Sequence, residues 1–555
     1  HFAGFQSSAD QSVEVGKFSR DARSDFVLRD LHQVVEGGFE ERAEFYDFGL
    51  DEFVSHLEDL GFHGVEKFFD VLVSLLAEFK GHGAGFHHFA QHGVVAEEVA
   101  PRFEMRRADD VGLDFDKRFE SADHFQTPGA GEPVDLKQLD LEALKTVASE
   151  TREAVLNRVS KHGGHIGPNL GFVEATVALH YVFDAPADKF VFDVSHQCYP
   201  HKVLTGRAAG FLGDLDDMNA ISGYSSPTEC PEYDNFEVGH TSTSISLATG
   251  LQKARDIRGS HENIIAIIGD GSLSGGEAFE GLDEASELGT GIIIVVNDNE
   301  MSIAENHGGI YKNLRALRES HGECQHNWFK AWGFDYHYLE EGNDVEQLIK
   351  VFASVKGTDR PTVVHIHTEK GHGFAPAVEN KEAWHWGAPF NREDGSRPAA
   401  PAVETYEALF SDWMLREMKR DSTLIAVTAG TPAAGGFTPE KRREAGKQHI
   451  DMGIAEEQAA AMISGMAKGG LHPVWTVYST FIQRTYDQIA QDLCINANPA
   501  VINVMGGGIR SMNDITHICL FDIPMLCSIP GLIYLAPTTC EEYFAMLRWS
   551  ILQDK

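Results

Sequence analysis

Two short polar segments follow apolar runs of strand length, and both carry side chains that bind divalent cations. Gly269-Asp270-Gly271-Ser272 comes directly after the run 264–268, and Asn297-Asp298-Asn299 follows the run 292–296. A Gly-Asp-Gly at the carboxyl end of a parallel strand lets the backbone approach a phosphate, while the Asp supplies a hard oxygen for a cation. A Gly-Asp-Gly alone is often only a turn. Paired with an Asn one strand later, it predicts a Mg²⁺ and phosphate site at the edge of an α/β sheet.

From Thr127 onward, the chain alternates helix-like periods with short apolar runs. Runs without polar alternation are typical of strands buried on both faces of a parallel sheet. The pattern predicts an α/β fold with two doubly wound parallel-sheet domains, 127–400 and 401–555, joined by a Gly/Pro/Ala-rich linker at 387–402. The predicted strands are 190–194, 264–268, 292–296, 362–367, 424–427, 474–477 and 501–504, and the predicted helices are 135–160, 171–183, 404–419, 455–468 and 482–493.

Residues 1–126 differ in composition from the rest of the chain. They contain no Ile, Thr, Asn, Cys or Trp, although they hold about half of the 35 phenylalanines. Average usage of those five types predicts roughly 20 residues in a segment of this length. Helix-like apolar spacing is present, so an acidic helical extension is one interpretation. Our preferred hypothesis is that this segment is not part of the enzyme fold but a misassigned reading frame, which recovery of its tryptic peptides from the native protein would refute.

The charge of the chain excludes two classes of partner. With 84 acidic and 46 basic side chains, the formal net charge at pH 7 is −38, which opposes binding to nucleic acid or to an anionic membrane. No apolar run approaches the ~20 residues that span a bilayer, and no secretory signal is visible. Seven cysteines without a CxxC spacing predict free thiols and a cytoplasmic location rather than disulfides or zinc.

Several motifs together resemble one enzyme family. They are Gly163–Gly171, Asp193–Lys202, Gly239–Ser246, the Gly-Asp-Gly and Asn-Asp-Asn pair, Gly453–Glu456 and Tyr478–Phe481. In this order, over about 430 residues, the chain resembles the 1-deoxy-D-xylulose-5-phosphate synthases of the transketolase superfamily. The resemblance implies a homodimeric transferase that uses thiamine diphosphate and Mg²⁺. It also implies that pyruvate, with loss of CO₂, is condensed with glyceraldehyde 3-phosphate to make a precursor of isoprenoids and thiamine.

The resemblance assigns roles to individual residues. Asp270, Asn299 and the backbone carbonyl of Met301 match the metal ligands. Glu456 matches the glutamate that hydrogen-bonds the aminopyrimidine and so promotes loss of the thiazolium C2 proton, for which a raised pKa is expected. The remaining matches are catalytic His165, His385 and His517, cofactor-binding His196, Gly239, His240, Gly269, Gly271, Ser272, Phe481 and Lys370, and substrate-binding Tyr478, Arg484 and Asn513.

Local positive charge is a separate feature of this acidic chain. His201, Lys202, Lys370 and Arg484 are cations near the motifs, and an anionic substrate needs such focused charge in a negative field. The sequence therefore predicts that these four side chains attract the substrate.

The segment 505–517 departs from the family pattern. Gly506 and Asn513 stand where the family usually has an arginine and an acceptor-binding aspartate, and a glycine cannot replace the anion fork of a guanidinium. Asp514 or Arg510 could substitute after a local shift. The substitutions leave two functional alternatives open, a catalytically silent paralogue that binds the cofactor and a ketol transferase with a different acceptor. The family's third domain is also not found before Lys555, so either this sequence is truncated or a separate subunit supplies that domain.

Overall fold

The computed structural model describes residues 135–212, 221–397, 404–508 and 515–554. We call residues 135–397 the first lobe and residues 404–554 the second lobe. The segment 1–126, with the two hypotheses about it, lies outside the described residues, as do Asn513, Arg510 and Asp514. No described helix has the length and apolar character needed to cross a lipid bilayer.

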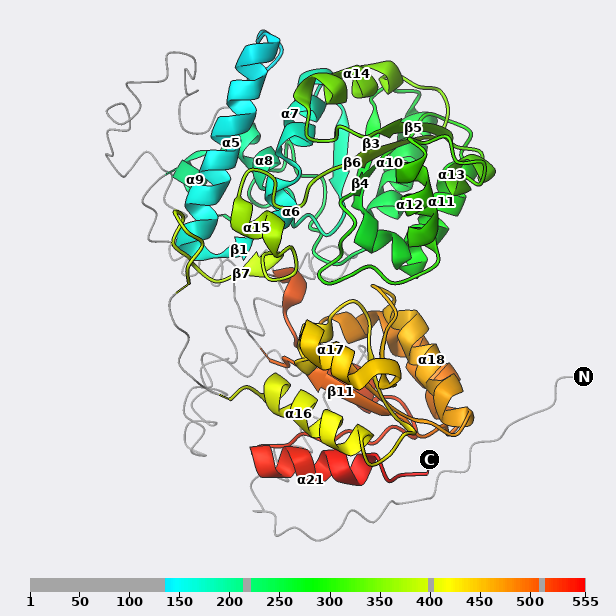
Figure 1. The fold of residues 1–555 in the computed structure, drawn as a ribbon. Coiled ribbons are helices and arrows are strands. Elements are labelled where there is room, and N and C mark those ends of the chain that lie inside the picture. Colours follow the sequence, from blue (N-terminus) through cyan, green and yellow to red (C-terminus); the bar gives the residue numbers. More distant parts are fainter. Residues whose placement is uncertain (1–134, 213–220, 398–403, 509–514, 555) are drawn as a thin grey trace, which may run out of the picture. The chain divides into compact units, whose positions relative to one another are not determined.

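A parallel five-stranded sheet organises the first lobe (Figure 1). The strand order is β2-β3-β4-β6-β5, and every neighbouring pair is parallel. A two-stranded antiparallel ribbon joins β1 to β7. In chain order the elements are α5 (Leu141–His162), β1 (Gly164–His165), α6 (Gly167–Leu170), α7 (Val173–Val182), β2 (Lys189–Phe192), α8 (Tyr199–Lys202), η6 (Val203–Arg207), α9 (Ala209–Leu212), α10 (Ser244–Arg258), β3 (Ile264–Gly269), η7 (Asp270–Ser274), α11 (Gly276–Glu287), β4 (Ile293–Asp298), α12 (Ile310–Glu319), α13 (Trp328–Ala331), β5 (Asp335–Leu339), α14 (Val345–Val355), β6 (Thr362–His367), α15 (Ala375–Glu379) and β7 (Trp386–Gly387).

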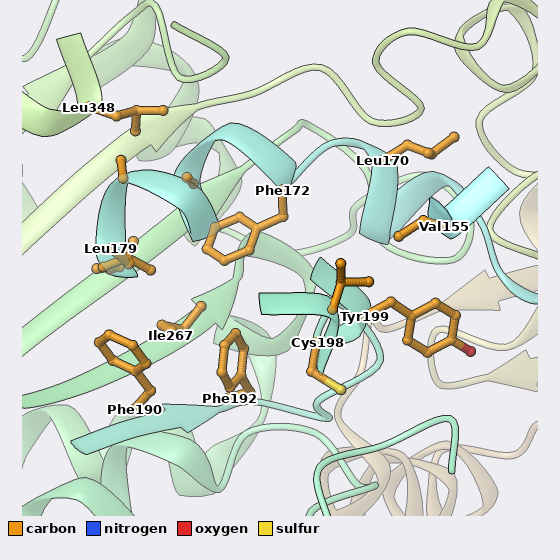
Figure 2. Close-up of a cluster of buried hydrophobic side chains, with 14 of the residues drawn as sticks. Val155, Leu170, Phe172, Leu179, Phe190, Phe192, Cys198, Tyr199, Ile267 and Leu348 are labelled. Atoms are coloured by element: carbon orange, nitrogen blue, oxygen red, sulfur yellow. The ribbon is translucent and has the colours of Figure 1, made fainter. Parts of the chain in front are cut away.

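Helices cover both faces of this sheet, which is why its strands are apolar without alternation. Along β3, Ile265 and Ile267 face the cluster that contains α5, α7 and α14, whereas Ile264, Ala266 and Ile268 pack against α10, α11 and α12. Figure 2 shows part of the first cluster, in which Phe172 of the α6–α7 turn lies above Ile267 and Phe192. The sheet is therefore a rigid core whose strand ends can hold polar side chains in fixed positions.

The second lobe contains a parallel four-stranded sheet in the order β11-β10-β8-β9. Helix α18 and the segment 489–494 cover one face through Ile463 and Leu493, and α16 covers the other through Phe410 and Met414. The elements are α16 (Tyr406–Met418), β8 (Leu424–Thr428), η8 (Pro432–Gly435), α17 (Pro439–Ala445), η9 (Gly446–Gln448), β9 (His449–Asp451), α18 (Glu456–Lys468), β10 (His472–Tyr478), η10 (Phe481–Thr485), α19 (Tyr486–Gln488), η11 (Ile489–Cys494), β11 (Val501–Met505), η12 (Ile515–His517), α20 (Asp522–Cys527) and α21 (Cys540–Ser550).

The predicted α/β class and the two parallel sheets are confirmed, and all seven predicted strands are present to within two residues at each end. The edge strand β5 was not predicted, because the sequence of Asp335–Leu339 has no apolar run and only Tyr336 in it is buried. Strand β9 was also missed, since three residues carry no usable pattern. The seven cysteines are free thiols, as predicted.

Two helix predictions and the linker prediction are wrong in part. The first helix begins at Leu141 rather than 135, because the Asp140 carboxylate accepts a hydrogen bond from the Ala143 amide and caps the helix there. The predicted helix 482–493 is a series of 3₁₀, α and π turns over 481–494. The start of the predicted linker is packed, since Gly387 pairs with Gly164 and Phe390 is buried against Trp384.

Candidate active site

Three adjacent strands of the first sheet end in the polar residues that the sequence singled out. Asp270 follows β3, Asn299 follows β4, and Lys370 lies three residues after β6. Because β4 lies between β3 and β6 with parallel pairing, the carboxyl ends of these strands meet at one edge of the sheet. This edge is where open α/β sheets bind ligands.

Two neighbouring carboxyl groups at this edge have different surroundings. Asp298 is buried, but its carboxylate accepts hydrogen bonds from Arg318, from His365 Nε2 at 2.9 Å and from the Glu300 amide at 3.1 Å. Burial acts to raise the pKa of Asp298, yet His365 and Arg318 outweigh it and lower that pKa. Asp270 has no such cations bonded to it, and burial, followed by the charge of Asp298, raises the pKa of Asp270 to about 7. Asp270 is therefore the carboxylate that an added cation would stabilise.

Unpartnered buried oxygens support this interpretation. Asn299 Oδ1, Ser302 Oγ and Asn306 Oδ1 are buried without a hydrogen-bond partner among the described residues. Buried polar atoms are normally bonded, so such a group indicates a ligand that supplies the missing contacts. Within the described ranges, no cluster of three or more His, Cys, Asp or Glu side chains could hold a metal. A Mg²⁺ site of one carboxylate with amide and carbonyl oxygens does not require one.

The segment after Asn299 forms a tight turn around Asp270. Met301 and Glu305 pair in an isolated antiparallel bridge. Asn306 Nδ2 donates to Asp270 Oδ2 at 2.5 Å, and Lys370 Nζ donates to the Ser302 carbonyl at 2.5 Å. Burial lowers the pKa of Lys370 to about 7, while Asp270 opposes that shift. We call residues Met301–Asn306 the metal turn, since it carries the predicted ligand Met301 and contacts Asp270.

Two of the predicted glycines lie where a side chain would collide with a neighbour. A Cβ on Gly271 would meet Ser302 Cβ and Oγ at 3.0 Å. A Cβ on Gly239 would overlap the Thr516 side chain of the second lobe. Gly269 has open space at the same point, so its absent side chain leaves room at the strand end. Ser272 is buried, and its carbonyl accepts a hydrogen bond from Ser242 Oγ at 2.8 Å.

In the second lobe, Glu456 is the first residue of α18 and is 3% exposed. Burial raises the pKa of this carboxyl to about 7, although Arg484 Nη1, 3.5 Å from Glu456 Oε2, opposes the shift. The raised pKa expected from the sequence is thus present. At neutral pH such a group can hold or release a proton, as a general acid or base must.

Two second-lobe side chains bond the first lobe beside Glu456. His240 Nε2 is 2.9 Å from Thr480 Oγ1 and 3.0 Å from the Thr516 carbonyl. Arg484 donates to the Thr241 hydroxyl at 3.2 Å and to the Thr241 carbonyl at 3.0 Å. The polar strand ends of one lobe and Glu456 of the other therefore belong to a single region. Arg484 therefore contacts Thr241 of the first lobe and Glu456 of the second.

A continuous set of aromatic rings connects the predicted histidines of both lobes. Ring centroids of His165, His196 and His385 lie 5.2 to 5.6 Å apart. Tyr224 contacts His165 at 5.7 Å and stacks on His517 at 5.1 Å. The set continues through His240–His517 at 5.3 Å, His240–Phe481 at 5.2 Å, Phe481–His517 at 5.6 Å and Tyr478–Phe481 at 6.2 Å.

Two of these histidines are neutral at physiological pH. Burial, with the charges of Lys370 and His517, lowers the pKa of His196 to about 3. Burial also holds the pKa of His385 well below its ordinary value, with Lys370 and His196 acting in the same direction. The Nδ1 atoms of both rings are buried without a partner among the described residues. A neutral imidazole with a free nitrogen can hydrogen-bond a bound ligand or accept its proton.

Some residues of this region were missed, and one prediction is corrected. Tyr224 and Asn306 lie in loops without periodicity, so nothing in the sequence distinguished them, and Thr241 was quoted within the motif Gly239–Ser246 but was given no role. His201 and Lys202 are wrong as substrate attractors, because both are buried and bonded to carboxylates. His201 Nε2 is 3.0 Å from Asp234 Oδ1, and Lys202 Nζ donates to Glu229 Oε2 at 2.6 Å.

Comparisons with known proteins match both lobes. The family model for 1-deoxy-D-xylulose-5-phosphate synthase matches residues 129–326, and the model for the transketolase pyrimidine binding domain matches 404–555. The 1-deoxy-D-xylulose-5-phosphate synthase of Desulforudis audaxviator is 38% identical over 459 residues, 76% of this chain and 72% of the relative. The chain belongs to the 1-deoxy-D-xylulose-5-phosphate synthase family. The Listeria monocytogenes synthase is 40% identical over 411 residues, 72% of this chain and 67% of that protein.

Solved structures include a transketolase from Leishmania mexicana, with a TM-score of 0.38 and 17% identity over 74% of this chain and 75% of that one. A similarity this low adds nothing to the family assignment. Membership of the 1-deoxy-D-xylulose-5-phosphate synthase family, together with the pyrimidine-binding domain match, implies thiamine diphosphate as the cofactor and small molecules as substrates.

Proposed function

We propose that this chain is a thiamine-diphosphate- and Mg²⁺-dependent 1-deoxy-D-xylulose-5-phosphate synthase, which condenses pyruvate with glyceraldehyde 3-phosphate and releases CO₂. The observation that carries the proposal is the joining of two half-sites by His240–Thr480 and Arg484–Thr241. One half has a carboxylate and unpartnered oxygens suited to a metal-bound diphosphate. The other half has a buried, protonatable glutamate in contact with Arg484, and Phe481 lies on the same short helix as Arg484, which suits a heterocycle.

The fit of the cofactor rests on this chain's own atoms. Asp270, Asn299 Oδ1 and the Met301 carbonyl would hold Mg²⁺, and the orphaned Asn299 oxygen supports that role. The diphosphate end would be surrounded by Gly239, His240, Gly269, Gly271, Ser272 and Lys370. The pyrimidine would contact Phe481 and Glu456, and the substrate would contact Tyr478, Arg484 and Asn513. When bound, thiamine diphosphate supplies a carbon nucleophile and an electron sink for decarboxylation.

The protein's part in the reaction is to move protons and exclude water. Glu456 holds a proton at its carboxyl oxygen near neutral pH, because its pKa is about 7. His196 and His385 are neutral, so His385 would offer its Nδ1 to a substrate oxygen and His196 would offer its Nδ1 to the cofactor. His165 and His517 lie next in the ring series, within reach of a proton that enters or leaves the same space. The surrounding rings lower the local dielectric, which strengthens these hydrogen bonds.

The direct test is to incubate the purified chain with Mg²⁺, thiamine diphosphate, pyruvate and glyceraldehyde 3-phosphate. We expect deoxyxylulose phosphate and one CO₂ per product, measured by mass spectrometry and by trapping of labelled CO₂. Cofactor binding is measured separately by calorimetry. Saturable binding without CO₂ would mean a silent cofactor-binding paralogue, and absence of binding would refute the proposal.

A second candidate is a ketol transferase that uses another acceptor. It is supported by Gly506 at the end of β11, whose φ of +71° suits glycine and offers no side chain to an anion. The same assay with unphosphorylated aldehydes distinguishes the two. CO₂ release that depends on a neutral aldehyde, and not on glyceraldehyde 3-phosphate, would favour this candidate.

We also propose that the enzyme is a homodimer that pairs through the second lobe. Eleven of the thirteen exposed large hydrophobic residues in the described ranges belong to that lobe, among them Leu520, Phe521 and Ile523. Exposed apolar side chains in such excess are typical of an interface. Light scattering should give the mass of a dimer for the wild type and a lower average mass for Phe521→Glu. A wild type with the mass of a monomer would refute pairing. The cytoplasmic location and the domain boundaries at 127–400 and 401–555 stay predictions.

A further inference from the structure

Arg442 of the second lobe binds two carboxylates of the first lobe. It lies on α17, which is capped by Thr438 and begins at Pro439, and its side chain is 9% exposed. Its Nη1 and Nη2 donate to the two Glu382 carboxylate oxygens at 3.1 and 2.9 Å. Nη2 also donates to Glu305 Oε2 at 2.6 Å, and Nη1 donates to the Phe437 carbonyl at 2.9 Å. One guanidinium therefore links two separate segments of the first lobe.

The first of these segments is the metal turn. Glu305 pairs through its backbone with Met301, whose carbonyl is the predicted third ligand of the metal. Its neighbour Asn306 donates to the Asp270 carboxylate. A displacement of Glu305 therefore affects Met301 through their backbone bridge, and it affects Asp270 through the neighbouring Asn306.

The second segment carries His385. The His385 amide donates to the Glu382 carbonyl at 3.2 Å. The Trp384 and His385 carbonyls accept hydrogen bonds from the Gly167 and Ile166 amides at 2.8 and 3.2 Å. Glu382 therefore begins the short turn that aims the His385 ring at His165 and His196.

We propose that Arg442 is a positioning residue that sets the metal turn and the His385 segment relative to each other. The inference rests on the proposed function, since it concerns the metal and substrate ends of that site. Arg442 touches neither end itself and acts through Glu305 and Glu382. Its two branches predict two separable effects, one on Mg²⁺-dependent cofactor binding and one on pyruvate.

The geometry requires an arginine at this position. The bidentate fork on Glu382 with a further bond to Glu305 uses both Nη atoms, and the point charge of a lysine cannot reproduce it. The next residue offers a matched control, because Arg443 is on the same helix, is mostly exposed and bonds only Glu440 within α17 among the described contacts.

The experiment compares Arg442→Met, Arg442→Lys, Arg443→Met, Glu305→Gln and Glu382→Gln in the full chain. The first readout is the Mg²⁺ concentration needed for thiamine diphosphate binding, measured by calorimetry without substrate. The second is KM and kcat for pyruvate at saturating cofactor. Thermal melting of each apo variant monitors folding.

We expect Glu305→Gln to raise the Mg²⁺ concentration needed for cofactor binding about tenfold, because one charge-assisted hydrogen bond is lost. The KM for pyruvate should not change. Glu382→Gln should raise the KM for pyruvate and should not change the Mg²⁺ concentration needed for cofactor binding. Arg442→Met should do both, Arg442→Lys should restore only part of either, and Arg443→Met should match the wild type.

Three outcomes would overturn the inference. The first is an Arg442→Met enzyme equal to Arg443→Met in both readouts. The second is that Glu305→Gln and Glu382→Gln change both readouts alike, which is the behaviour of a contact that only stabilises the fold. The third is full rescue by lysine. If Arg442→Met does not fold, the two glutamine variants still decide. A wild type that binds no cofactor would instead refute the proposed function.

Discussion

Each lobe buries a carboxyl group with a raised pKa at the proposed site, and the surroundings of these two groups differ. Burial raises the pKa of both Asp270 and Glu456 to about 7. The charge of Asp298 raises the pKa of Asp270, unpartnered oxygens lie in the turn that contacts it, and Asn306 and Lys370 oppose the rise. Glu456 has Arg484 within 3.5 Å. The cost of burying each carboxylate is therefore offset in a different way. A divalent cation would stabilise Asp270, whereas Glu456 would share a proton.

This difference explains the division of labour between the lobes. A carboxylate among other oxygen ligands gains most from a metal, because the ion's charge offsets the cost of burial. A single carboxyl at a helix start, with a cation at hydrogen-bonding range, can lose or keep its proton near neutral pH. The comparison predicts that substitutions in the first lobe mainly affect binding and those in the second mainly affect proton transfer.

The largest expected effect is that of Asp270→Asn. Losing the only carboxylate ligand should weaken Mg²⁺-dependent thiamine diphosphate binding by about 1,000-fold, in line with the cost of breaking a buried charge pair. Calorimetric titration at fixed Mg²⁺ measures it, with the exposed Asp283→Asn in the same lobe as the control. Binding within threefold of the wild type would place the metal elsewhere.

The second prediction concerns Glu456→Gln. Hydrogen–deuterium exchange at C2 of the bound cofactor should slow at least about 100-fold, because a glutamine cannot exchange a proton with the ring. Cofactor affinity should change only a few-fold. Glu541→Gln is the matched control, since Glu541 is an exposed acid in the first turn of α21. If Glu456→Gln lost cofactor affinity as strongly as proton exchange, the proposed difference between Glu456 in proton transfer and Asp270 in binding would be wrong.

The pH dependence of stability gives a third test on the same residue. In the apo protein, stability from protonated Glu456 is fully present below its unfolded pKa near 4.3 and is lost as pH rises toward the folded value of about 7. Glu456→Gln should therefore gain up to about 3 kcal/mol over the wild type between pH 4.5 and pH 8. Urea unfolding at several pH values measures this gain. A pH-independent difference would mean that Glu456 does not titrate in this range.

The smallest predicted effect is on the contact between the lobes. Thr480→Val removes the hydroxyl 2.9 Å from His240 Nε2 and should raise KM for pyruvate about fivefold, roughly the worth of one neutral hydrogen bond. Thr485→Val removes a hydroxyl that bonds Ile482 within the second lobe and should cost similar stability without a kinetic effect. Identical kinetics in both variants would show that the contact does not order the site.

Local sequence patterns predicted the strands well and the irregular helices poorly. Strand β6 matches its prediction at both ends, because an apolar run buried on both faces is distinctive in the sequence. The segment 481–494 has helical apolar spacing but breaks into 3₁₀ and π turns, an outcome that spacing does not reveal. The start of the first helix was missed because the Asp140 cap outweighed the apolar residues before it.

The site shows the same division. Gly269–Ser272 and Asn299 were proposed from the sequence because each directly follows an apolar run, and the structure places them at the carboxyl ends of neighbouring parallel strands. Glu456 was found from a motif, and its raised pKa follows from burial. Tyr224, Asn306 and Arg442 were not found, since their contacts join residues up to 293 positions apart in the chain.

By itself, the sequence determined the α/β class, the strands and the chemical types at the strand ends, because hydrophobic periodicity and short motifs are local properties. Only the tertiary structure decided which charges are already neutralised, as for His201, Lys202 and Asp298, and which oxygens lack partners, as for Asn299. Those outcomes depend on long-range packing that brings distant charges within hydrogen-bonding distance and removes water from them.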